Sequence, residues 1–270
     1  MKHYFLYVTT VLLFASCDLI DYHPYDTRVN GEKGLTEKNV HKIVEQCAGK
    51  DTLRIVHISD TQRWYDETEE LVSAINQRGD VDFVIHTGDH SDFGITKEFL
   101  WMRDIYQKLS MPYVCIIGNH DCLGTGADVY RSMFGDVNFN FNASFLHVVC
   151  LNTNAFEYDY STAVPDFTFI EEDIKALPDS ITQTIVGMHA IPGSEQFNNN
   201  VTNYFDYMLN KYPGISFCMS GHDHHSDVHY PFQNEERKGL PFYECASAKN
   251  KNYILYTITK DSYSYEIVKL

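Results

Sequence analysis

From Leu53 onward, short apolar runs alternate with segments of helical periodicity, and this alternation restricts the fold more than any other feature. The strand-like and helix-like segments follow one another at 53–59, 67–77, 81–87, 95–109 and 112–117. The helix-like segments carry apolar residues at helical spacing, as at Leu71, Ala74 and Ile75. A βαβαβ order of this kind predicts a mostly parallel sheet with helices packed against it.

The rest of the chain is richer in strands than in helices. Strand signals occur at 137–141, 145–152, 184–188, 215–219, 228–230, 241–245, 253–258 and 263–268, and helix signals at 37–47, 169–177 and 204–209. Apolar residues make up 44% of the 270 residues, enough for the core of one large domain. We therefore expect an α/β protein in which two packed β-sheets are flanked by helices.

The N-terminal segment predicts export. Lys2 and His3 give a weakly basic start, and the mostly apolar stretch 4–15 that follows is too short for a membrane-spanning helix. Residues 14–17, with the sequence FASC, resemble the lipobox of bacterial lipoproteins, in which the cysteine is lipidated. We therefore expect a lipid on Cys17, with an ordinary signal peptide or a buried apolar strand as the alternatives.

This interpretation divides the chain into three parts. Residues 1–16 form a lipoprotein-type signal peptide, residues 17–50 form a tether with a short helix, and residues 51–270 form the main folded domain. The mature protein is then expected on the periplasmic or cell-surface side of a bacterial membrane, held there through its lipid alone.

The formal net charge of −16, from 37 acidic and 21 basic residues, limits the partners. An acidic surface repels a phosphate backbone, so a nucleic-acid polymer is not an expected partner. A small phosphorylated substrate remains compatible with this charge, because bound metal ions can invert the charge locally. The oligomeric state stays open.

Five polar clusters each follow directly after a predicted strand. They are Asp60-Thr61-Gln62, Gly88-Asp89-His90-Ser91-Asp92, Gly118-Asn119-His120-Asp121, His189, and Gly221-His222-Asp223-His224. Open α/β sheets place their ligand sites at the carboxyl ends of strands, so the five clusters should meet at one edge. Taken singly, each has an ordinary explanation, such as a turn, a buried histidine or a solvated loop. Their carboxylates, imidazoles and amide oxygens together form a donor set suited to Mn, Fe, Zn or similar divalent ions.

This ordered set resembles the motifs of the calcineurin-like metallophosphoesterases, D-x-H, G-D-x-x-D/N, G-N-H-D/E, H and G-H-x-H. The resemblance runs from Leu53 to His224 and departs from the family pattern at Gln62, where histidine is usual. It implies a four-layer αββα sandwich and two divalent metal ions. It also implies hydrolysis of phosphate monoesters or diesters by a hydroxide that bridges the two ions.

The resemblance also implies a role for each matching residue. Asp60, His224 and Gln62 would bind the first metal ion; Asn119, His189 and His222 the second; Asp89 both; His120 would face the leaving group and Asp92 would orient His120. Arg63 is a further candidate for contact with a substrate phosphate, whereas His90 and His225 are expected to point away. A metal-binding scaffold without activity is the alternative function. Phe93, which replaces an arginine found in the family's protein phosphatases, argues against a phosphoprotein substrate.

Overall fold

The computed structural model describes residue 23 and residues 25–158, 162–233 and 239–270, and these residues form two β-sheets. The first sheet has the strand order β11–β10–β1–β2–β3, with β1 (Thr52–Ile58), β2 (Phe83–His86), β3 (Tyr113–Cys115), β10 (Asn252–Thr259) and β11 (Tyr263–Lys269). The second sheet has the order β4–β5–β6–β7–β9–β8, with β4 (Phe139–Ala143), β5 (Leu146–Cys150), β6 (Gln183–Gly187), β7 (Ile215–Ser220), β8 (Asp227–His229) and β9 (Phe242–Glu244).

Both sheets are mixed, and each is parallel around the strands that lead to the polar clusters. Strand β1 pairs parallel with β2, and β2 pairs parallel with β3, whereas β10 and β11 extend the first sheet antiparallel. In the second sheet β5, β6, β7 and β9 are parallel, and β4 and β8 are antiparallel edge strands. The carboxyl ends of the parallel strands therefore gather at one edge of each sheet.

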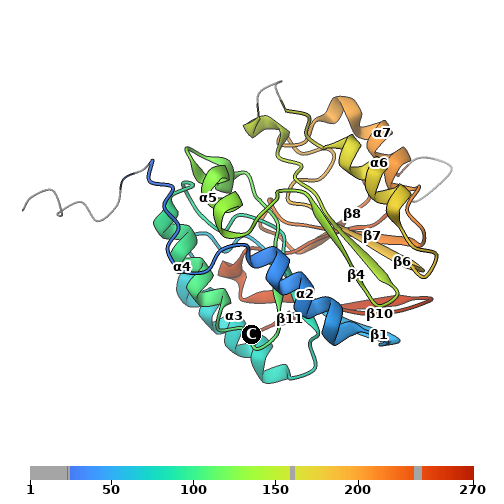
Figure 1. Cartoon of the computed structure of the whole chain (residues 1–270), viewed down its shortest axis with the longest axis horizontal. Coiled ribbons are helices and arrows are strands. Elements are labelled where there is room, and N and C mark those ends of the chain that lie inside the picture. Colours follow the sequence, from blue (N-terminus) through green and yellow to red (C-terminus); the bar gives the residue numbers. More distant parts are fainter. Residues whose placement is uncertain (1–22, 24, 159–161, 234–238) are drawn as a thin grey trace, which may run out of the picture.

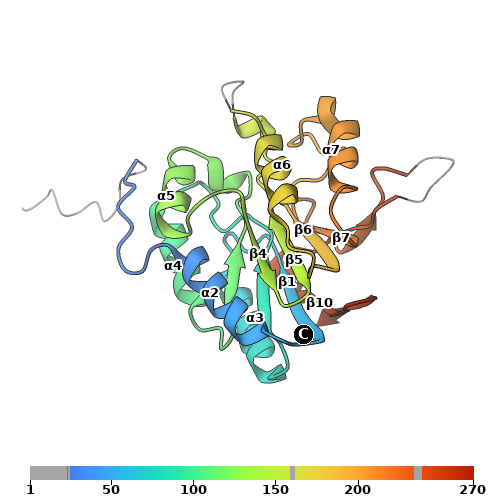
Figure 2. The same ribbon diagram turned by 45° about the vertical axis from the view of Figure 1, so that its right-hand side comes forward.

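Helices cover the outer faces of both sheets, so the predicted four-layer αββα sandwich is confirmed (Figure 1). The helices are α2 (Leu35–Cys47), α3 (Tyr65–Arg78), α4 (Thr96–Tyr106), α5 (Gly126–Met133), α6 (Phe167–Ala176) and α7 (Thr202–Leu209). Helices α3, α4 and α5 lie on the side of the first sheet, and α6 and α7 lie on the opposite side of the molecule (Figure 2).

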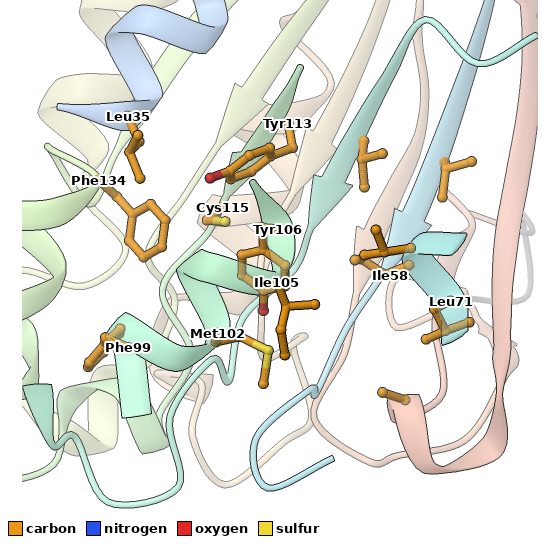
Figure 3. Close-up of a cluster of buried hydrophobic side chains, with 14 of the residues drawn as sticks. Leu35, Ile58, Leu71, Phe99, Met102, Ile105, Tyr106, Tyr113, Cys115 and Phe134 are labelled. Atoms are coloured by element: carbon orange, nitrogen blue, oxygen red, sulfur yellow. The ribbon is translucent and has the colours of Figure 1, made fainter. Parts of the chain in front are cut away.

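The alternation of side chains along the strands builds the core between these layers. In β1, Val56 and Ile58 pack toward the helices, and Leu53 and Ile55 pack into the space between the two sheets. Figure 3 shows the helix-side cluster, in which Ile58 of β1 lies with Leu71 of α3 and Met102 of α4 between the first sheet and its helices. Both faces of β1 are therefore buried toward its carboxyl end, where even the polar His57 is fully enclosed.

Within residues 17–50, the described segment 25–50 packs against the domain that follows it. Helix α2 contacts β3 and β4, and its Ile43 and Cys47 are fully buried in the cluster between the sheets. Upstream of this helix, Val29 is also buried, and the Arg103 guanidinium donates a hydrogen bond to the Asn30 carbonyl. The predicted signal peptide and the lipidation site lie outside the described residues.

Helix α5 is an element that the sequence pattern did not lead us to expect. It begins at Gly126, close to Gly124, and two glycines so near each other indicate a loop rather than a helix. Its buried residues Val129, Tyr130 and Met133 nevertheless follow helical spacing.

In the described part of the chain, no helix has the length and apolar character needed to cross a membrane.

Candidate metal centre

All five polar clusters lie at the carboxyl ends of strands and meet where the two sheets face each other. Asp60 follows β1 and Asp89 follows β2 in the first sheet, whereas His189 follows β6 and His222 follows β7 in the second. The two sheets are joined here, because His189 Nε2 lies 3.4 Å from Asp89 Oδ2 and the His222 amide donates to Asp60 Oδ2 at 3.1 Å. The centre thus depends on both sheets.

Asp60, Gln62 and His224 are the candidate residues of a first ligand group. The Nε2 atom of His224 lies 3.3 Å from Asp60 Oδ1, and this contact raises the pKa of His224 above its usual value. The side chain of Gln62 is buried and donates from Nε2 to Asp89 Oδ2 at 3.1 Å. Its Oε1 has no hydrogen-bond partner among the described residues, and an unpaired buried amide oxygen is available to a cation.

Asn119, His189 and His222 are the candidate residues of a second ligand group. Asn119 Oδ1 lies 2.9 Å from His189 Nε2 and 3.2 Å from His222 Nδ1. His189 Nδ1 donates to the Thr87 carbonyl at 2.8 Å, so Nε2 is the ring atom that faces this group and would bind an ion after losing its proton. Three donor atoms from three different strand ends therefore converge.

Asp89 stands between the two groups. Its Oδ1 accepts a hydrogen bond from the His120 amide at 3.0 Å, and its Oδ2 contacts Gln62 of the first group and His189 of the second. Burial alone would raise the pKa of Asp89, but the neighbouring His189 imidazole holds it below the ordinary value. Burial alone would also lower the pKa of His189, but the Asp89 carboxylate outweighs it and raises that pKa to about 10. The pocket around Asp89 therefore favours positive charge.

These donors fit divalent metal ions. Ligands that share an ion with bonds of about 2.0–2.2 Å stand roughly 3 Å apart, and the contacts within the two groups measure 2.9–3.3 Å. Ligand atoms of Asp60, Asp89 and His189 all lie within 4.8 Å of one another. The donors are carboxylates, imidazoles and amide oxygens, without a thiolate, as Mn, Fe or Zn accept.

The backbone at the centre is strained, which indicates that the ligand positions are under functional constraint. Positive φ angles occur at Asp60 (50°), Asp89 (62°), His222 (88°) and His224 (64°). Such conformations cost about 1–3 kcal/mol each outside glycine and concentrate at functional sites. Gly118 allows a related close approach, because a Cβ there would collide with Asp89 Oδ1.

The carboxylate of Asp121 holds the loops of the centre together. It accepts hydrogen bonds from the backbone amides of Asp89, His90, Ser91 and Gly118 at 2.8–3.0 Å, and it is completely buried. These amides belong to the turns after β2 and β3, so one side chain fixes both turns relative to each other. Asp121 is therefore a positioning residue.

His120 is placed beside the centre rather than in either ligand group. Its Nδ1 lies 2.8 Å from the backbone carbonyl of Asp92, whereas the Asp92 carboxylate is 3.7 Å away. That carboxylate is instead hydrogen-bonded to the guanidinium of Arg63. The structure thus brings Asp92 to His120 as expected, but the closer contact is made by the main chain. With Nδ1 donating to this carbonyl, Nε2 is the ring atom left for exchange of a proton.

A cavity of about 390 Å³ adjoins the centre. It is lined by Gln62, Arg63, Trp64, His120, His224, His225, Ser247, Lys249 and Asn250. Arg63 and Lys249 bring positive charge to its wall, and the Lys249 ammonium lies 5.2 Å from the centre of the Trp64 ring. The expectation that His225 points away is wrong, because it lines this cavity. His90 does point away, toward the Ile116 carbonyl.

Three residues near the centre were missed by sequence reasoning. Asp121 ends the Gly-Asn-His-Asp motif and could have been identified by that position. Glu195, whose Oε1 is 3.2 Å from His222 Nε2, lies in a loop with no recognisable pattern. Lys249 lies in the short 3-10 turn Ala248–Asn250 after β9, and no sequence motif marks it. The last two contacts exist because of tertiary packing, which no local pattern encodes.

Gln62→His should tighten the first ligand group and shift it toward Zn, Ni or Co, because imidazole is a better donor than an amide oxygen for these ions. We expect the wild-type group to bind more weakly than the second group and to favour harder ions such as Mn or Mg. The measurement is metal content after dialysis, with activity across a series of ions. Gln77→His on the exposed surface of α3 is the control. Two full equivalents in wild type, with unchanged ion preference in Gln62→His, would show that this position does not tune the centre.

A family profile described as calcineurin-like phosphoesterase matches residues 53–226. The chain is also 25% identical over 202 residues to a 3',5'-cyclic-nucleotide phosphodiesterase from Nostoc sp., in an alignment that covers 67% of this chain and 71% of that protein.

Solved structures share the fold at low sequence identity. The purple acid phosphatase PPD1 from yellow lupin (Lupinus luteus) is 13% identical with a TM-score of 0.65, covering 82% of this chain and 52% of that one. GAP50, the anchor in the inner membrane complex of Plasmodium, is 13% identical with a TM-score of 0.58, covering 82% of this chain and 85% of that one.

Proposed function

The chain belongs to the calcineurin-like phosphoesterase family, and from this premise we propose that it hydrolyses small phosphate esters at two divalent metal ions. The observation that carries the proposal is the position of Asp89, which contacts members of both ligand groups. Asp60, Gln62 and His224 would hold one ion, and Asn119, His189 and His222 the other. When bound, the ions would polarise the phosphoryl oxygens and lower the pKa of an attacking water.

His120 would act on the leaving group. An alkoxide needs a proton as its bond to phosphorus breaks, and histidine is the side chain that donates protons near neutral pH. The Asp92 carbonyl fixes the ring through Nδ1, so the proton would leave from Nε2. The Asp92 carboxylate would act indirectly, by holding Arg63 beside the cavity.

The cavity supports a small anionic substrate. Its volume of about 390 Å³ lies within the usual range for small-molecule sites. Arg63 and Lys249 would attract the phosphate, and the flat ring of Trp64 offers an apolar surface for the rest of the substrate. The Nostoc relative is named as a phosphodiesterase of cyclic nucleotides, so phosphodiesters of this type are the first substrates to test.

The test is a panel of phosphomonoesters and phosphodiesters, 3',5'-cyclic nucleotides included, assayed with added Mn, Zn, Fe or Mg. We expect hydrolysis that depends on added metal and is absent from a chelator-treated control. An Asp89→Asn preparation made in parallel controls for contaminating phosphatases. Metal binding without hydrolysis of any ester would contradict the proposal and favour a non-catalytic metal-binding scaffold.

We also propose that the protein is exported and anchored through a lipid on Cys17, as the residues before this cysteine indicate. Cys17→Ala should release the protein from the membrane fraction, because the protein part supplies no other anchor in this proposal. The measurement is fractionation of cells that express each form, with mass spectrometry of the N-terminus. An unmodified Cys17 in the mature wild-type protein would contradict the proposal, and Cys47→Ala, which alters a buried cysteine, is the control.

A further inference from the structure

A second group of potential metal ligands lies outside the centre, at the edge of the second sheet. Asp223, His229 and Glu244 each offer one ligand atom, and these atoms all lie within 4.8 Å of one another. Strand β8 pairs antiparallel with β9 so that His229 lies opposite Phe242, which places His229 and Glu244 on the same face of the sheet. Asp223 reaches them from the loop after β7.

One carboxylate oxygen of the buried Glu244 lacks a hydrogen-bond donor among the described residues. Glu244 is only 1% exposed, and its Oε2 lies 2.7 Å from His229 Nε2. Its Oε1 has no hydrogen-bond partner in the part of the chain that the structure describes. Burial raises the pKa of Glu244 to about 7, although the His229 contact acts in the opposite direction. A buried carboxylate oxygen without a donor or a cation costs free energy, so this position favours a positively charged ligand.

The cluster is accessible to such a ligand. A cavity of about 450 Å³ is bordered by Asp223 and His229, and it also contains Glu195. Asp223 is exposed and His229 is partly exposed, so a hydrated ion can reach the two side chains before contacting the buried Glu244.

We propose that Asp223, His229 and Glu244 form an additional divalent-cation site, separate from the centre at Asp89. Two carboxylates and one imidazole supply the mixed oxygen and nitrogen donors that Mn, Fe or Zn accept. The charge of the ion balances both carboxylates, and Glu244 Oε1 gains the partner that it lacks. Since only three side chains contribute, water completes the coordination, and the site binds more weakly than the main centre.

An ion at this site would also restrict the movement of the loop that carries two ligands of the main centre. Asp223 lies between His222 and His224, each of which belongs to one ligand group of the main centre. An ion bound by Asp223 and by side chains of β8 and β9 therefore ties this loop to the edge of the sheet. Occupancy should stabilise the folded chain, because the ion binds only where the three elements are brought together.

The test is titration of the full chain with Mn, in which free Mn is measured by electron paramagnetic resonance and bound equivalents are counted. The variants are Glu244→Gln and His229→Ala, and His41→Ala, which removes an exposed histidine from α2, is the matched control. We expect wild type and His41→Ala to bind one weak equivalent more than either variant. The rise in melting temperature at high Mn should shrink in both variants.

His229→Ala decides the outcome if Glu244→Gln folds poorly, because His229 is partly exposed and lies on an edge strand. A stoichiometry in His229→Ala equal to that of wild type would overturn the proposal. The cluster would then be an ion pair between His229 and Glu244 that binds no metal.

Discussion

Replacing His120 with alanine should lower kcat for an alkyl phosphate ester by about 10²-fold to 10⁴-fold, the usual contribution of a general acid. The imidazole is held by a 2.8 Å contact between Nδ1 and the Asp92 carbonyl, so Nε2 is the atom placed to donate. The loss should be much smaller for a nitrophenyl ester, since nitrophenolate leaves without a proton. The measurement is kcat for a pair of esters that differ only in the pKa of the leaving group.

Two controls separate this role from structural damage. Metal content of His120→Ala should equal that of wild type, because His120 belongs to neither ligand group. Asp92→Asn should reduce kcat less than His120→Ala, because asparagine keeps the backbone carbonyl that orients the ring. An equal loss of kcat for good and poor leaving groups would show that His120 does not protonate the leaving group.

The sheets were predictable because burial on both faces leaves a strong local pattern. Strand β2 is buried at every position, and its sequence FVIH is correspondingly apolar with a single polar end. Helix α5 was not predictable in the same way, because the glycines at its start indicate a loop and its eight residues are few for a periodic pattern. The apolar face of α5 is recognisable only in the folded protein, where Val129 and Met133 pack into the core.

The candidate ligands were predictable because each one directly follows a strand, and the fold brings parallel strand ends together. The contacts of His120 were not, since the direction of the Asp92 carbonyl depends on the turn that Asp121 holds through the amides of Asp89, His90 and Ser91. The contact between His222 and Glu195 could not be predicted from the sequence for a different reason. Glu195 reaches His222 across 27 residues of chain, and such a contact leaves no local signal.

Asp89→Asn should remove both metal ions together. A change in a residue that only supports a ligand costs about 10-fold to 100-fold in metal affinity, so losing a carboxylate shared by both groups should cost at least as much at each. Asparagine can still accept the His120 amide at Oδ1, which preserves the turn. Its amide nitrogen then faces Gln62 and His189, where the carboxylate oxygen accepted hydrogen bonds. Both ligand groups therefore lose a negative charge and gain a competing donor.

The experiment counts bound metal by elemental analysis after dialysis, for wild type, Asp89→Asn and Asp92→Asn. The last variant is the matched control, because it removes the same charge from the same loop but from a carboxylate that pairs with Arg63 instead of the ligand groups. We expect Asp92→Asn to keep its metal and Asp89→Asn to lose metal from both groups, with hydrolysis of every ester in the panel falling in parallel. Loss of a single equivalent from Asp89→Asn, with the other retained at wild-type affinity, would mean that Asp89 serves one ion only. The two ions would then be held independently, and the shared position of Asp89 would no longer support a two-metal centre.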